Sequence, residues 1–151
     1  MSDKPRFAAP PGTCDAHMHI YGPPEKYPEA PTSKLPPPYA PLSEYRKVMA
    51  RLGVERVVVV QPASYGYDNS CTMDAVAELG PQARAIVVVG PEERDADLAR
   101  LTSQGARGVR FHMFAGGVLK FEELEATAAR VHEHGWHVQL QMDGRQLHER
   151  A

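Results

Sequence analysis

Several features that would place a protein in a class at once are absent from this sequence. Its 151 residues include two cysteines, Cys14 and Cys71, with neither a paired metal-ligand spacing nor a disulfide framework. No apolar run approaches the length of a membrane span, and the charged amino terminus lacks the apolar stretch of a signal peptide. The net charge of -2 leaves no basic excess for nucleic acid. We therefore expect a cytoplasmic protein with reduced thiols and with neither a nucleic-acid nor a membrane partner.

Two common catalytic signatures are missing as well. There is no Gly-x-Ser-x-Gly motif, which argues against a serine nucleophile on a sharp strand-to-helix turn. No glycine-rich turn follows the first predicted strand, where the chain instead reads His-Met-His and then runs into prolines. The composition, 42% hydrophobic and 24% charged, is that of an ordinary globular domain.

What the sequence does contain is an alternation of β-branched runs and amphipathic stretches. Strands are predicted at 13–17, 57–60, 85–89, 108–113 and 136–141, and helices at 42–52, 70–79, 95–104 and 121–134. Such alternation is typical of βαβ units and a parallel sheet, so the fold class is α/β. Five units match either a small open sheet or the N-terminal part of a TIM-like (β/α)8 barrel, which needs about 250 residues. We predict the barrel, with residues 1–151 as a single partial domain and the chain as a fragment.

A proline-rich segment at 21–41 interrupts this pattern. Pro36, Pro37 and Pro38 follow one another there, and proline both removes a backbone donor and restricts the residue before it. We expect an irregular loop rather than a helix or a strand. A loop of roughly twenty residues in a compact domain is commonly functional or mobile, with a disordered linker as the alternative.

His17 and His19 are the strongest candidates for chemistry. They stand two residues apart at the end of the first predicted strand, so alternation points both imidazoles to one side. In a parallel α/β barrel the active site lies at the carboxyl ends of the strands, which is where this pair falls. We predict that the pair either ligates a divalent metal such as zinc or polarises a substrate carbonyl without one. The structural alternative is two strand-end histidines that face solvent.

Arg110 and His112 form a second alternating pair, in the sequence Val-Arg-Phe-His-Met. A charged residue in an apolar strand is costly to bury without a partner. The guanidinium is a planar fork that matches a carboxylate, so we interpret Arg110 as a carboxylate clamp with His112 beside it. An internal ion pair is the alternative.

Two further polar residues fall at predicted strand ends. Ser64 follows a proline after the second strand, where it can donate a hydrogen bond to a substrate or simply form a turn. Gln139 and Gln141 alternate with apolar residues in the fifth strand, which indicates a wet face. We count Gln141 with Ser64, Arg110 and His112 as substrate-binding candidates.

Three blocks of sequence, in order, carry a family resemblance. They are Gly-Thr-Cys-Asp-Ala-His-Met-His-Ile from Gly12, Val-Val-Val-Val-Gln-Pro-Ala-Ser-Tyr-Gly-Tyr-Asp-Asn from Val57, and Gly-Ala-Arg-Gly-Val-Arg-Phe-His-Met from Gly105. Together they resemble the amidohydrolase superfamily, and within it the amidohydrolase-related branch of 2-pyrone-4,6-dicarboxylate lactonase and D-galactarolactone isomerase. The likeness covers nearly all of this chain but only the first half to two-thirds of the family's barrel.

The resemblance implies a distorted barrel that acts on lactones or related carbonyl compounds. By position it implies that His17 and His19 are the family's first-strand pair. It likewise implies a substrate-contacting hydroxyl at Ser64 and an arginine for a substrate carboxylate at Arg110. Gln141 falls where the pyrone lactonase has a tyrosine. Many members bind one or two divalent metals, whereas the lactonase-like branch works without one.

The sequence also departs from this family. The pyrone lactonase has a second arginine shortly after the position of Arg110, where this chain reads Phe-Ala-Gly-Gly from Phe114. The family's later-strand histidine and its water-activating aspartate have no counterpart within 151 residues. We therefore expect a hydrolase for a different lactone, or a related carboxylated carbonyl compound, with the carbonyl polarised by the His-x-His pair. The alternatives are a lactone isomerase on the same scaffold and a truncated, non-catalytic fragment. A homo-oligomer is a further expectation for this chain.

Overall fold

The computed structural model describes residues 5–7, 9–34 and 36–149 of the chain. Its centre is a parallel sheet with strands in the order β1-β2-β3-β4-β5. The strands are Cys14–Met18 (β1), Arg56–Val60 (β2), Ala83–Val87 (β3), Ala106–His112 (β4) and His137–Gln141 (β5). Each strand pairs with the next in the chain, as in a barrel wall, whereas a doubly wound sheet reverses its strand order at a switch point. The sheet is therefore a curled part of a TIM-like barrel.

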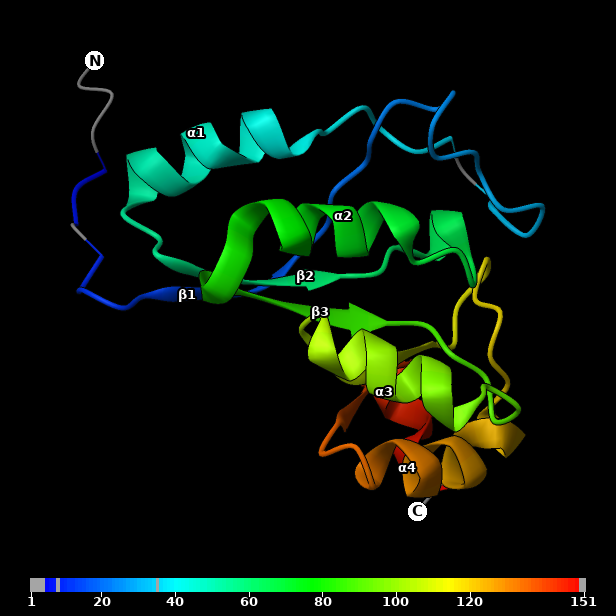
Figure 1. The fold of residues 1–151 in the computed structure, drawn as a ribbon. Helices are drawn as coiled ribbons and strands as arrows, with labels where there is room; N and C mark the ends of the chain where they lie inside the picture. Colours follow the sequence, from blue (N-terminus) through cyan, green and yellow to red (C-terminus); the bar gives the residue numbers. More distant parts are fainter. Residues whose placement is uncertain (1–4, 8, 35, 150–151) are drawn as a thin grey trace.

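Helices connect the strands and follow the curve of the sheet, from α1 at the top of Figure 1 to α4 at the bottom. They are Leu42–Leu52 (α1), Ser70–Leu79 (α2), Asp95–Ser103 (α3) and Leu124–His132 (α4). Short 3-10 helices are Ala63–Tyr65 (η1), Gly80–Gln82 (η2), Phe121–Glu123 (η3) and Gly144–Glu149 (η4). No helix in the described part of the chain is long and apolar enough to cross a membrane.

The predicted element types agree with the structure, and the differences lie at their ends. Helix α1 has the predicted bounds and ends at Gly53, whose positive φ of 75° lets its N–H donate to Met49 at 2.8 Å. Strand β3 begins and ends two residues earlier than predicted. It begins at Ala83, which pairs with Val57, and it ends at Val87 because the N–H of Val88 donates to the side chain of Asn69 at 2.8 Å instead of joining the ladder.

The core follows from the β-branched runs of the central strands. Val57, Val59 and Val60 in β2 are each at most 1% exposed, as is Val87 in β3. Phe111 in β4 has no exposed surface. Strands that are buried on both faces need apolar side chains at successive positions, so continuous apolar runs replace the usual alternation.

The proline-rich segment 21–41 has no helix or strand among its described residues. An antiparallel bridge between Tyr21 and Ala40 closes its base. Its middle is held by a hydrogen bond from the N–H of Ala30 to the carbonyl of Ser64, at 2.8 Å. The loop is therefore held against the carboxyl end of β2. In a barrel the active site lies at this end of the strands.

Candidate active site

The predicted histidine pair lies together at the end of β1. His17 is in the strand and His19 just beyond it, and their ring centroids are 5.0 Å apart with the rings nearly perpendicular, at 87°. His17 is exposed, whereas His19 is partly buried. The ring of Tyr21 follows at 6.2 Å from that of His19. Sequence reasoning missed Tyr21, although its spacing of two residues from His19 repeats that of the pair.

The hydrogen bond of His19 determines which of its nitrogens carries a proton. Nδ1 lies 2.8 Å from the backbone oxygen of Val60, and a carbonyl oxygen can only accept, so Nδ1–H is the donor. Burial lowers the pKa of His19, the bond to Val60 opposes this shift, and the charge of Arg110 adds to it. At neutral pH the ring is therefore neutral, with the lone pair on Nε2.

His17 is also held neutral, for similar reasons. Burial and the charge of Arg110 lower the pKa of His17, and the charge of Asp15 raises it by less. Asp15 itself is fixed by two hydrogen bonds, from the N–H of His17 at 3.1 Å and from the Tyr45 hydroxyl at 2.7 Å. Neutral imidazole keeps one N–H donor, so His17 can donate to an acceptor in the site.

Arg110 lies in the middle of β4 and its side chain is 6% exposed. Its Nη1 donates to the backbone oxygen of Gln61 at 2.7 Å, and its Nη2 donates to Oε1 of Gln141. Its Nε is buried and has no hydrogen-bond partner among the described residues. The structure thus shows no carboxylate paired with Arg110 in this part of the chain, so the internal ion pair considered from sequence is not what holds it.

His112 and Gln141 meet at the ends of β4 and β5, where they are register partners. Nδ1 of His112 lies 3.0 Å from Oε1 of Gln141. Arginine has only donors, so the Gln141 atom that faces Arg110 must be the oxygen, and His112 must then donate through Nδ1–H. One amide oxygen therefore accepts from two neighbouring side chains.

The loop after β4 covers this group closely. A cavity of only about 10 Å³ remains around Arg110 and His112, and Gly116, Gly117, Val118 and Leu119 line it from the loop. A Cβ on Gly117 would lie 1.8 Å from the carbonyl oxygen of His112, so only glycine fits. The second glycine of the Gly-Gly pair is therefore required by contact with β4.

Gln61, at the end of β2, organises the loop that precedes α2, and sequence reasoning did not single it out. It has no exposed surface. Its Nε2 donates to the carbonyls of Gly66 and Asp68, at 3.3 and 2.7 Å, and its Oε1 accepts from Thr72 at 2.6 Å. The backbone carbonyl of Gln61 also accepts a hydrogen bond from Arg110, so Gln61 links β4 to this loop. The sequence does hold a signal for this buried residue, because Gln61 is a single amide side chain directly after four valines.

Ser64 lies in η1, at the end of β2 as predicted. It is half-buried, and its backbone oxygen receives the bond from Ala30. Its hydroxyl has no hydrogen bond to another described residue and does not line the cavity beside Arg110. The structure therefore places His17, His19, Arg110, His112 and Gln141 toward the carboxyl ends of the strands. Among the described residues, no hydrogen bond of the Ser64 side chain links it to this group.

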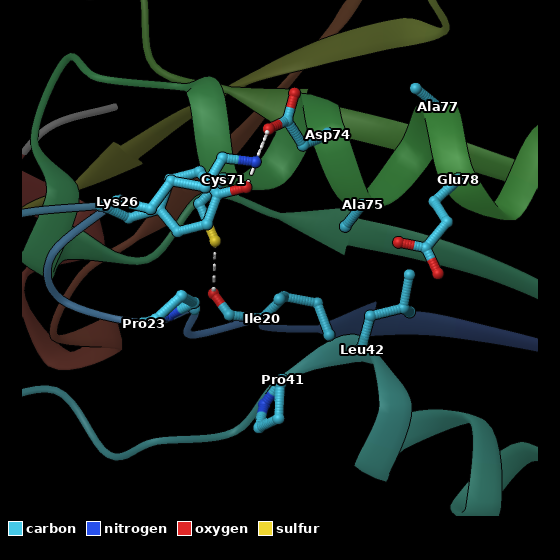
Figure 2. A pocket seen from close by; sticks show the side chains of 12 residues that line it. Ile20, Pro23, Lys26, Pro41, Leu42, Cys71, Asp74, Ala75, Ala77 and Glu78 are labelled. Atoms are coloured by element: carbon cyan, nitrogen blue, oxygen red, sulfur yellow. Dashed lines mark hydrogen bonds and ion pairs between the residues drawn. The ribbon is translucent and has the colours of Figure 1, made fainter.

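A larger hollow of about 520 Å³ lies elsewhere, between the proline-rich loop, the start of α1 and α2 (Figure 2). Its polar groups are paired with one another. Lys26 and the hydroxyl of Tyr27 each donate to Asp74 at 2.8 Å, and Cys71 contacts the carbonyl of Ile20 at 3.7 Å. None of the predicted site residues lines it.

The fit of a metal ion to the predicted pair is incomplete. Among the described residues, no group of three or more His, Cys, Asp or Glu side chains is placed to hold a metal. Catalytic zinc sites use three protein ligands, and this chain offers the two imidazoles of His17 and His19.

Comparison with known proteins identifies the family and agrees with the fold. A sequence model for the family described as Amidohydrolase matches residues 14–151. The chain therefore belongs to the amidohydrolase family. It is similar to an apo crystal structure from Agrobacterium tumefaciens, with a TM-score of 0.89 and 36% identity, over 96% of this chain and 53% of that one.

Two curated relatives are named for reactions of lactones. The chain is 45% identical to 4-sulfomuconolactone hydrolase of Hydrogenophaga intermedia over 106 residues, which is 70% of this chain and 35% of that protein. It is 37% identical to D-galactarolactone isomerase of Agrobacterium fabrum over 145 residues, which is 95% of this chain and 49% of that protein. The chain thus spans half or less of the length of these relatives.

Proposed function

We propose that this protein is a lactone hydrolase of the amidohydrolase family whose substrate carries a carboxylate. The observation that carries the proposal is Arg110, a buried cation with a free Nε–H beside two neutral histidines. Buried cations without a charge partner are costly, and a binding site for an anion explains why one is kept. The relatives' names support a lactone as the substrate class.

The roles follow from the donors and acceptors that the fold leaves available. Arg110 binds the carboxylate with His112 beside it, Gln141 contacts both of these residues in the free site, and Ser64 donates to the substrate from the end of β2. His17 polarises the carbonyl as a neutral N–H donor, a role that neutral imidazole can fill. His19 presents the Nε2 lone pair, which accepts from a water or hydroxyl. In hydrolysis the water oxygen bonds to the carbonyl carbon, the ring C–O bond breaks, and the ring oxygen gains a proton.

The imidazoles of His17 and His19 allow a route without a metal ion and a route with one. A metal-free route uses the N–H of His17 for polarisation. His17 and His19 would be the residues to hold a divalent cation such as zinc, and the cation would supply Lewis-acid polarisation of the carbonyl. Because the described residues supply only two ligands, no step above depends on the cation.

One alternative is favoured by a specific observation. The match over 95% of this chain to an isomerase favours a lactone isomerase with the same carboxylate clamp.

The test uses the 151-residue chain with 2-pyrone-4,6-dicarboxylate, in water enriched in oxygen-18. A hydrolase yields an open-chain product that carries one labelled oxygen, and an isomerase yields an unlabelled isomer. Arg110→Met is expected to abolish binding and turnover, whereas Arg94→Met, at an exposed surface arginine, is the control. Loss of turnover on chelation would assign the metal-dependent route. Equal binding by wild type and Arg110→Met would overturn the proposal, and binding without turnover would support the non-catalytic form.

A further inference from the structure

Gln141 occupies one half of the edge through which Arg110 would hold a carboxylate. A guanidinium binds carboxylates side-on through two parallel N–H groups, and Nε with the nearer Nη forms one such edge. In Arg110 the Nη1 group is held by the carbonyl of Gln61 at 2.7 Å, and Nη2 is held by Oε1 of Gln141. Nε is free of described partners. On this edge Nη2 is therefore hydrogen-bonded, and Nε is buried without a partner among the described residues.

We propose that Gln141 is a displaceable latch whose amide oxygen stands in for one oxygen of the substrate carboxylate. The inference rests on the proposed function, because it concerns the same clamp. On binding, the carboxylate takes Nε and Nη2 together, and the Gln141 side chain moves away from Arg110. No bond is made or broken covalently in this exchange.

The first support is the convergence of two donors on a single oxygen. Oε1 accepts from Arg110, and Nδ1 of His112 lies 3.0 Å from it. Such convergence suits a carboxylate oxygen, because a charged acceptor forms stronger bonds to these donors than a neutral amide does. A carboxylated ligand therefore has the free-energy advantage needed to replace the amide.

The second support is that the side chain of Gln141 can move more easily than that of Arg110. Arg110 is buried and fixed at Nη1 by Gln61, so it cannot follow the amide. Gln141 is the last residue of β5 and it is exposed. Its side chain is therefore free to turn away from Arg110, which is fixed in place.

The latch gives the site a preference for anions. A neutral lactone cannot compete with the amide for Nη2, so it leaves the latch in place. A carboxylated lactone replaces one neutral acceptor by a charged one and also gives the buried Nε an acceptor. Gln141 is in this sense a specificity-determining residue.

The test measures binding of 2-pyrone-4,6-dicarboxylate and of its neutral dimethyl ester to the 151-residue chain by calorimetry. Gln141→Ala is expected to bind the dicarboxylate about tenfold more tightly, because the competing hydrogen bond to a charged group is gone. Gln141→Glu is expected to abolish binding, because its own carboxylate occupies the edge. Gln139→Ala, two residues earlier on the same strand, is the matched control and is expected to bind as wild type.

Nuclear magnetic resonance of the Arg110 Nε–H provides a readout that turnover does not affect. Its proton signal is expected to move downfield when dicarboxylate binds to wild type or to Gln141→Ala, and to stay unchanged with the ester. If Gln141→Ala binds no more tightly than wild type while Arg110→Met abolishes binding, the latch is wrong and the proposed function stands. If wild type and Arg110→Met bind the dicarboxylate equally, or if neither wild type nor Gln141→Ala binds any carboxylated lactone tested, both the clamp and the latch are wrong.

Discussion

The middle of the sheet and its two edges differ in both packing and chemistry. β2, β3 and β4 have a neighbour on each side, and Phe111 in β4 has no exposed surface. In the described sheet β1 and β5 each have one neighbour, and Leu140 in β5 is 37% exposed. His17 and Gln141 lie on these edge strands, whereas Arg110 lies in the middle. Among the described residues, the buried cation of the candidate site therefore stands on a strand with two neighbours, whereas His17 and Gln141 stand on strands with one described neighbour.

The largest effect expected from this comparison is on core packing. Phe111→Ala should reduce the free energy of unfolding by about 4 kcal/mol, because a large buried ring leaves a cavity. Leu140→Ala is the matched edge substitution and should cost less than about 1 kcal/mol, since much of this side chain is already in water. Urea denaturation followed by circular dichroism measures both. Equal losses would show that the edges are packed as tightly as the middle.

The next largest effect is a difference in the free energy of unfolding between variants of Gln61 and of Gln139. Gln61→Leu should cost about 2 to 3 kcal/mol, because Thr72 and two loop carbonyls lose their buried partner. Gln139→Leu should be close to neutral, because its Oε1 is buried without a partner among the described residues. Denaturant unfolding of the two variants beside wild type tests this. A costly Gln139→Leu would mean that the edge strand is held by contacts of its own amide.

The smallest effect is a pH dependence of stability that arises from His17 and His19, in and just after β1. The pKa of both His17 and His19 is lowered from 6.5 by burial first, so the unfolded chain binds protons more readily than the folded one. Their contribution to stability is therefore complete above pH 6.5 and is lost as the pH falls through the lowered folded values. A double variant, His17→Gln with His19→Gln, should lose less stability than wild type between about pH 7.5 and about pH 5.5.

Thermal unfolding at the two pH values measures this difference, and His148→Gln in η4 serves as the control. That histidine is exposed and lies outside the candidate site. An equal loss of stability in the double variant and in wild type would contradict the assigned shifts.

Most of the fold was predictable because it depends on short-range patterns. The β-branched runs and the helical spacing of apolar residues predicted every main helix and strand, and Gly53 marked a helix end. Asn69 shows where local reasoning stops. Its position directly before α2 is typical of a helix cap, but its side chain bonds both backbone groups of Val88 instead. That contact depends on how two loops meet.

The candidate site was predictable in its residues and not in its bonds. The spacing of two predicted that His17 lies beside His19 and that Arg110 shares a face with His112. It did not predict the fully buried Gln61, nor the neighbouring Tyr21. The partners of Arg110 lie 49 and 31 residues away in sequence. No local pattern encodes such pairs.

The sequence by itself determined the order of elements, the family and the candidates at the strand ends, because period-two and period-3.6 patterns act over neighbouring residues. Only the tertiary structure decided which side chains meet there. The register of β4 against β5 placed Gln141 beside His112, and the end of β2 supplied carbonyls to His19 and Arg110. These contacts depend on the curl of the sheet, which brings together residues that are far apart in the chain. For that reason the tautomer of His19 and the latch on Arg110 belong to the fold rather than to any motif.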